Sequence, residues 1–167
     1  AVESLSADKA AAFAKYRALL TGDALAKGNV HNGRAIYERT CTVCHKLYGN
    51  GGEIGPDITG SNRANLDYIL ENILNPSGEI PEGYQLLLVT MRGGQTLAGT
   101  LASENAQQLV LRVVGLPPVT VAKSEIQSRE TIPTSMMPEG LLASLRDEDV
   151  IDLIGYLRTT QQVAKPE

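Results

Sequence analysis

Cys41-Thr42-Val43-Cys44-His45 is the stretch from which the rest of the sequence is interpreted, and it contains both cysteines and one of the two histidines of the chain. On the helical turn expected here, two cysteines three residues apart face the same way. Both thiols can then reach the vinyl groups on one edge of a haem, and the histidine that follows can ligate its iron. Because Cys-x-x-Cys-His is the attachment signature of c-type haem, the sequence predicts one covalent haem c per chain with His45 as a metal ligand.

Three other uses of this stretch are less favoured. A thioredoxin-like redox pair would follow a strand of a βαβ unit, whereas a helical stretch precedes Cys41. A structural zinc ion needs four ligands, and the only remote nitrogen donor is His31, whose spacing fits no common zinc finger. A disulfide across two residues would close a short loop and leave His45 without a role. We therefore favour haem attachment.

The composition sets broad limits on the function. With 43% hydrophobic and 20% charged residues, the 167 residues are typical of a soluble domain with at most a small appendage. Only 4% of the residues are aromatic, with one Phe and no Trp, so a haem would supply a large apolar plate that the core lacks. A net charge of −4 argues against a nucleic-acid partner.

The location is inferred from the haem motif. No apolar run is long enough to span a membrane, and the first residues lack the pattern of a signal peptide. Because c-type haem is attached outside the cytoplasm, we expect a mature or trimmed chain whose export signal lay upstream. The predicted location is periplasmic or otherwise extracytoplasmic, in a bacterium.

The chain is predicted to begin and end with helices. Helical spacing and capping residues predict helices over residues 6–20, 33–40 and 66–74, and a last helix that opens at Arg146-Asp147-Glu148-Asp149. A glycine-rich loop over residues 48–60 is expected to pass close to another part of the molecule. Between these parts the period changes to two, which predicts five short strands in an antiparallel meander, at residues 86–91, 96–102, 109–114, 119–122 and 126–130.

Several motifs, in order along the chain, resemble the haem-binding c-type cytochrome domain of planctomycetes and verrucomicrobia. They cover nearly everything from about Gly28 to Thr159: the haem motif, Gly55-Pro56-Asp57-Ile58-Thr59-Gly60, Pro81-Glu82-Gly83-Tyr84, Met137-Pro138-Glu139-Gly140-Leu141 and Asp152-Leu153-Ile154-Gly155-Tyr156-Leu157. In that family the domain often closes a longer secreted protein with dehydrogenase-like or helical-repeat modules. The resemblance thus implies an excised C-terminal domain.

The helical parts also resemble class I cytochromes c, in which the first and last helices cross. This resemblance assigns the crossing to Gly33 and Tyr37 against Tyr156 and Leu157. The expected fold is mainly α, a class I cytochrome c-like helical fold with an inserted antiparallel β-sheet subdomain of about five short strands. The expected domains are a lead-in helix at 1–22, a cytochrome c domain at 23–161 with its β insertion at 84–131, and a tail at 162–167.

The sixth iron ligand has four candidates. Met137 is favoured, because it lies in an irregular segment before the last helix and matches the methionine of the family's Met-Pro-Glu-Gly stretch. Met136 stays open as the alternative. Met91 lies in an expected strand and is interpreted as packing, and His31 as a solvated surface residue.

Two further residues are expected at the haem. The resemblance implies that the carbonyl of Pro56 accepts a hydrogen bond from His45, which would fix the ring tautomer. Arg63 is a candidate to pair with a haem propionate, since a guanidinium suits a carboxylate, although a surface role is nearly as well supported.

One-electron transfer without enzymatic activity is the predicted function. His and Met ligation suits a redox haem, and the sequence offers no nucleophile, second metal site or phosphate loop in its proper context. The expected partner is a redox protein or a fused dehydrogenase module. The alternatives are a haem enzyme or a gas or redox sensor with a displaceable distal Met, with Glu139 as the nearest acid or base, and a β insertion that acts as a docking module.

Overall fold

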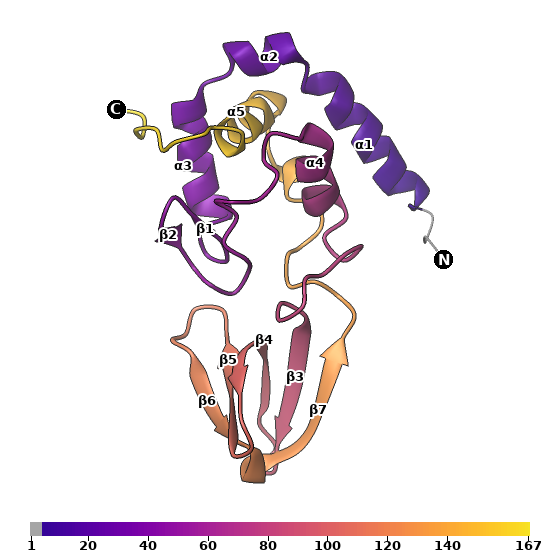
Figure 1. Ribbon diagram of the computed structural model, residues 1–167. Coiled ribbons are helices and arrows are strands. Elements are labelled where there is room, and N and C mark those ends of the chain that lie inside the picture. Colours follow the sequence, from indigo (N-terminus) through magenta and orange to yellow (C-terminus); the bar gives the residue numbers. More distant parts are fainter. Residues whose placement is uncertain (1–4) are drawn as a thin grey trace. The chain divides into compact units, whose positions relative to one another are not determined.

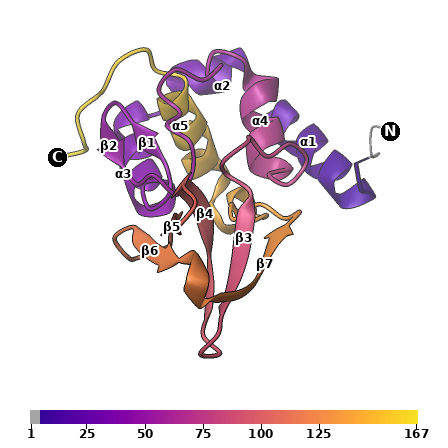
Figure 2. The same ribbon diagram turned by 60° about the horizontal axis from the view of Figure 1, so that its bottom comes forward.

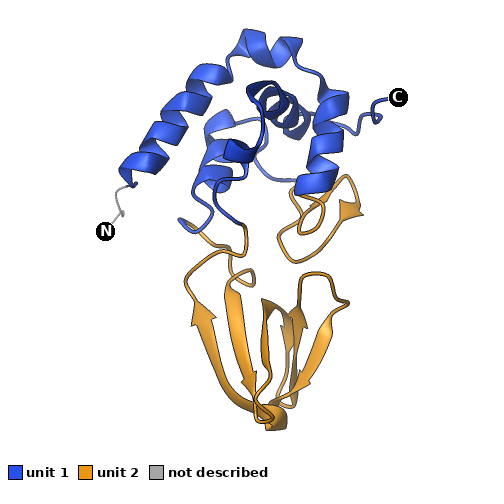
Figure 3. Cartoon of the chain, turned by 180° about the vertical axis from the view of Figure 1, so that it is seen from behind, with its two compact units in different colours: residues 1–40, 60–78, 138–167 blue, residues 41–59, 79–137 orange. Residues whose placement is uncertain are grey.

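The computed structural model describes residues 5–167, so the first four residues of the expected lead-in lie outside the described part (Figure 1). The chain folds into two compact units. The first contains residues 1–40, 60–78 and 138–167, and the second contains residues 41–59 and 79–137 (Figure 3). Each unit is thus built from segments that are distant in the sequence.

The first unit is helical. Its elements are α1 (Ala7–Leu19), α2 (Gly22–Lys27), α3 (Val30–Thr40), α4 (Leu66–Leu74), the short 3-10 helix η2 (Leu142–Ser144) and α5 (Asp147–Leu157). The predicted helices are all present. The short α2 was not predicted because its six residues show too little periodicity; it is capped by the hydroxyl of Thr21, which accepts from the amide of Ala24. Helix α3 begins three residues earlier than expected because the Asn29 side chain caps it.

Helices α3 and α5 cross through a glycine. A Cβ atom on Gly33 would overlap the carbonyl oxygen of Asp152 and lie 2.7 Å from Cβ of Tyr156. Beside this point the rings of Tyr37 and Tyr156 lie 5.4 Å apart and tilted by 56°. The predicted crossing is confirmed, since only a residue without a side chain lets the two backbones approach this closely.

The second unit contains a five-stranded antiparallel sheet of β3 (Leu86–Met91), β4 (Thr96–Glu104), β5 (Gln108–Arg112), β6 (Val119–Ala122) and β7 (Ile126–Ile132). The strand order is β6-β5-β4-β3-β7, and the predicted meander is wrong at its last strand, because β7 pairs with β3 and not with β6 (Figure 2). A smaller hairpin of β1 (Lys46–Leu47) and β2 (Asn50–Gly51) belongs to the same unit.

The large sheet has to curl, because one turn of 3-10 helix, η1 (Lys123–Glu125), joins β6 and β7, which are the two edges of the sheet. On the inner face, Leu87, Val89, Leu109, Leu111 and Val121 form an apolar cluster. At the end of β4, the carboxylate of Glu104 binds Lys123 at 2.7 Å and Arg129 at 2.9 Å, which ties η1 and β7 together.

The expected fold class is wrong. The chain is 34% helix and 21% strand, so it is not mainly α. The sequence predicts the strands as a subdomain inserted into a helical fold. They instead enclose an apolar cluster of their own, which makes the sheet a second structural centre.

Candidate haem-attachment site

The Cys-x-x-Cys-His stretch forms one helical turn directly after α3. The backbone N–H of His45 donates to the carbonyl of Cys41 at 2.9 Å, and that of Cys44 donates to the same carbonyl at 3.1 Å. Val43 is 62% exposed, and neither cysteine is in a disulfide. The turn therefore has the helical spacing that sets two thiols on one side of the chain.

The two thiols are partly buried. Burial raises the pKa of Cys41 to about 12, with a smaller contribution from the charge of Cys44. Burial also raises the pKa of Cys44. Redox-active Cys-x-x-Cys pairs have the opposite property, since a lowered pKa makes one thiol nucleophilic.

The glycine-rich loop lies against this turn, as its composition predicts. Tyr48 and Gly49 close the small hairpin with φ of 51° and 81°, which is the left-handed pair that a two-residue turn of this kind needs. In β2, a Cβ on Gly51 would overlap the carbonyl oxygen of His45, and just beyond the hairpin one on Gly52 would overlap that of Val43. The amide of Gly52 donates to Thr42 at 2.8 Å.

The same loop holds the imidazole of His45. The carbonyl oxygen of Pro56 lies 2.8 Å from Nδ1 of the ring. Since a carbonyl only accepts, Nδ1 carries the proton, and Nε2 is the nitrogen that a metal would take. Gly55 lies against the ring, where an added Cβ would be 2.7 Å from Cε1, and its amide donates to Cys44 at 2.8 Å.

The guanidinium of Arg63 holds the end of α5. Its Nη1 donates to the carbonyls of Leu157 at 2.6 Å and Thr159 at 2.7 Å. These carbonyls lie at the end of a helix, where partners are otherwise missing and a positive charge is favourable. This contact gives Arg63 a role in the first unit that its sequence context does not predict.

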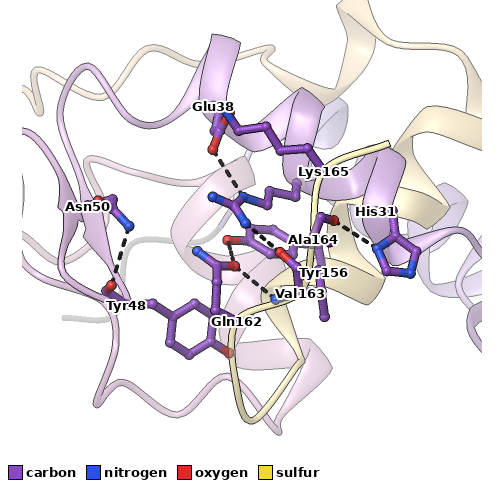
Figure 4. A network of polar contacts seen from close by, with 10 residues as sticks. His31, Glu38, Tyr48, Asn50, Tyr156, Gln162, Val163, Ala164 and Lys165 are labelled. Carbon is purple, nitrogen blue, oxygen red and sulfur yellow. Dashed lines mark hydrogen bonds and ion pairs between the residues drawn. The ribbon is translucent and has the colours of Figure 1, made fainter. Parts of the chain in front are cut away.

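The remaining ligand candidates lie in different settings. Met91 packs against the apolar cluster of the sheet. His31 is exposed on α3, and its Nδ1 lies 2.8 Å from the carbonyl oxygen of Ala164 in the C-terminal segment (Figure 4).

Met136 and Met137 are both half-buried, and the amide of Met137 donates to Ser135 Oγ at 3.1 Å. Glu139, the candidate acid or base, forms an ion pair with Lys9 at 2.8 Å.

Two residues near the site have no sequence signal that points to a role there. Thr100, in β4, donates its hydroxyl to the carbonyl of Ile54 at 3.1 Å, which links the sheet to the loop around His45. A threonine in a strand and an isoleucine in a loop are ordinary in a sequence, so neither carried a signal.

Comparison with known families identifies the part of the chain that contains this site. Residues 28–86 match the family model described as Cytochrome C oxidase, cbb3-type, subunit III. The match supports a c-type cytochrome domain in this chain and implies haem binding. No curated protein matches the chain.

The matched residues include α3, the haem motif, the glycine-rich loop and α4, and they end at the first residue of β3. The donor set fits a c-type haem: two cysteines outside any disulfide and an imidazole with a fixed tautomer lie on one turn. Within residues 5–167 no three His, Cys, Asp or Glu side chains cluster as a metal site would require. In the same part of the chain no helix is long and apolar enough to cross a membrane.

Proposed function

We propose that this protein is a monohaem c-type cytochrome that transfers single electrons, with haem c bound to Cys41 and Cys44 and with His45 as the proximal ligand. The observation that carries the proposal is the hydrogen bond from Nδ1 of His45 to the carbonyl oxygen of Pro56, at 2.8 Å. A ring oriented in this way is what an iron ligand needs.

The chain's own residues prepare the ligand. The bond to Pro56 fixes which nitrogen is protonated, and it raises the basicity of the other nitrogen. Gly55 lets the loop backbone approach the ring, so that little space remains for the imidazole to turn. When bound, the haem supplies an iron that changes its charge by one electron. A protein that holds its ligands rigidly suits that step, because little has to move.

We propose Met137 as the second iron ligand, with Met136 as its competitor. Met137 belongs to the same compact unit as His45 and lies in the irregular segment that follows β7. Its backbone is held by the turn to Ser135. A thioether ligand would raise the reduction potential.

Spectra of three proteins test the haem and its ligands together: the native protein, Met136→Ala and Met137→Ala. We expect the native protein to keep its haem in denaturing electrophoresis, and to be low-spin with a methionine charge-transfer band when oxidised. Only Met137→Ala should become high-spin. A native protein without covalent haem, or one that is high-spin and five-coordinate, would contradict the proposal.

The finer assignments are part of the same proposal. We place the protein outside the cytoplasm, where c-type haem is attached. We also propose that its electrons come from a dehydrogenase, which in the group of bacterial domains that the motifs resemble is often a module of the same polypeptide. Reduction of the purified oxidised protein by a candidate dehydrogenase and its substrate checks the donor. Failure of every extracytoplasmic dehydrogenase of the source organism to reduce it would contradict this assignment.

A further inference from the structure

The buried hydroxyl of Thr100 is unusual among the described residues. Apart from tyrosines, Thr100 is the one polar or charged side chain in the buried core of residues 5–167, and it is 1% exposed. A hydroxyl withdrawn from water is unfavourable unless it has a hydrogen-bond partner. Its partner is the carbonyl oxygen of Ile54, 46 positions earlier in the chain, at 3.1 Å.

Ile54 immediately precedes the two residues that hold His45. Its side chain is 9% exposed, so the segment is anchored. The next residue, Gly55, binds the carbonyl of Cys44 and lies against the imidazole, and the residue after it, Pro56, accepts from Nδ1. A shift of the Ile54 carbonyl would therefore move both contacts of the ring.

Arg112 fixes Thr100 from the other side. Its Nη1 donates to the carbonyl of Leu101 at 3.1 Å and lies 3.4 Å from Thr100 Oγ1. The guanidinium also lies over the ring of Tyr84, 5.2 Å from its centre. Glu53, which directly precedes Ile54 in the loop, has a lowered pKa. Lys46 is the main cause, and the positive charge of Arg112 makes a smaller contribution. The hydroxyl of Thr100 thus lies in a fixed position.

We infer that Thr100 is a positioning residue for the axial histidine, through which the β-sheet tunes the haem. The inference rests on the proposed function, since it requires His45 to ligate iron. Without the hydroxyl, the Ile54 carbonyl would be left buried and without this donor. The loop would relax, the bond between Pro56 and His45 would weaken, and the imidazole would donate less electron density to the iron, which raises the reduction potential.

The experiment compares the native protein with Thr100→Val, which removes the hydroxyl at nearly constant shape, and Thr100→Ser, which keeps it. Thr120→Val on the exposed side of β6 is the matched control. Two quantities are measured in each protein: the midpoint reduction potential, and the hydrogen-exchange rates of the Gly55 and Val89 amides. Val89 lies in the core of the sheet and reports global unfolding.

In Thr100→Val we expect a positive shift of the potential and an exchange rate at Gly55 that rises about tenfold relative to Val89. Thr100→Ser should keep both quantities close to their native values, and Thr120→Val should leave them unchanged. Equal potentials and equal relative exchange in Thr100→Val and the native protein would overturn the inference. A serine variant that behaves like the valine variant would also overturn it.

A second variant keeps the test open if Thr100→Val does not fold. Arg112→Gln removes the guanidinium that fixes Thr100, and it should change both quantities in the same direction and by a smaller amount; unchanged values would overturn the inference. A chain that carries no haem has no such potential, and this result refutes the proposed function instead. Exchange at Gly55 still reports whether Thr100 holds the loop in that case.

Discussion

At the scale of single residues, the glycines around the Cys-x-x-Cys-His turn show how the chain can surround an imidazole with backbone. Gly51, Gly52 and Gly55 each lie where a Cβ would meet the turn. Their amides and carbonyls can therefore approach groups that a side chain would keep away. We expect each position to tolerate substitution poorly, for a steric reason that can be tested separately from the haem ligands.

We predict that Gly55→Ala impairs the site without changing any ligand. The new Cβ would lie 2.7 Å from Cε1 of His45, so the loop or the ring must move, at a cost of about 1–3 kcal/mol in unfolding free energy. Urea denaturation and the optical spectrum measure the two effects. Gly60→Ala is the control, since nothing lies within 4 Å of its added Cβ. A native spectrum and native stability in Gly55→Ala would contradict this account.

At the scale of the elements, the crossing of α3 and α5 joins segments more than 100 positions apart in the sequence. Asp152 contributes to it twice. Its backbone carbonyl lies against Gly33. Its carboxylate accepts from the backbone amide of Asn29 at 2.7 Å and from the side chain of Asn32 at 2.8 Å, which ties α5 to the beginning of α3.

Gly33→Ala should therefore separate the two helices. We expect a loss of about 2–4 kcal/mol in unfolding free energy, because the overlap is with backbone and cannot be relieved by a rotamer change. Gly155→Ala in α5 is the matched control: its Cβ would be 3.6 Å from Val30 Cγ1, an ordinary contact, and alanine is the better helix former. Denaturant unfolding followed by circular dichroism compares them. Equal effects of the two substitutions would show that close approach at Gly33 is unimportant.

The second unit makes a prediction about pH. Hydrogen bonds from Arg129 and Lys123 lower the pKa of Glu104 from 4.5 to about 2. A carboxyl group whose pKa is lowered in the folded state stabilises the fold at pH values above its unfolded-state pKa. That contribution is lost as the pH falls from about 4.5 toward 2. The group is exposed, so the effect is modest.

Glu104→Gln should be less stable than the native protein at neutral pH, and the difference should shrink as the pH approaches 2. Thermal unfolding at a series of pH values measures it. Glu130→Gln, on the same strand as Arg129, is the control and should show no comparable trend. A difference between Glu104→Gln and the native protein that does not depend on pH would show that the ion pairs of Glu104 are not its cause.

At the scale of the whole molecule, distant segments of each unit are joined by a few polar contacts. Arg63 binds carbonyls 94 and 96 positions later. The C-terminal segment lies along α3 through the ion pair of Lys165 with Glu38 at 2.8 Å and the bond of Arg34 to Val163 at 2.5 Å (Figure 4). These contacts fasten Arg63 to the end of α5 and the C-terminal segment to α3.

We predict that Arg63→Met lowers the unfolding free energy by about 1.5–3 kcal/mol, because two helix-end carbonyls lose a charged donor. Arg158→Met, exposed at the end of the same helix, should have almost no effect. Chemical denaturation measures both, together with the reduction potential. An unchanged stability with a shifted potential would favour the propionate role that the sequence suggested for Arg63.

The sequence indicated the helices, the strand segments and the haem motif because these depend on local spacing. Helical and two-residue periods identify elements, and the close approach of a loop can be read from its glycines. The mainly α fold class and the meander were wrong because both depend on long-range pairing. No local pattern shows that β7 returns to β3, or that the strands enclose a core of their own.

By itself the sequence determined the chemistry at the turn: two thiols and an imidazole at fixed spacing on one helical turn, followed by a loop that can approach them. Only the tertiary structure decided what supports that chemistry. The hydrogen bond between His45 and Pro56 was predicted from a family resemblance, and the fold supplies its geometry. The contacts of Thr100 with Ile54 and of Arg63 with α5 had no sequence signal. The physical reason is that a hydrogen bond between residues 46 or 94 positions apart leaves no periodicity in the chain and exists only once the backbone has brought the two groups together.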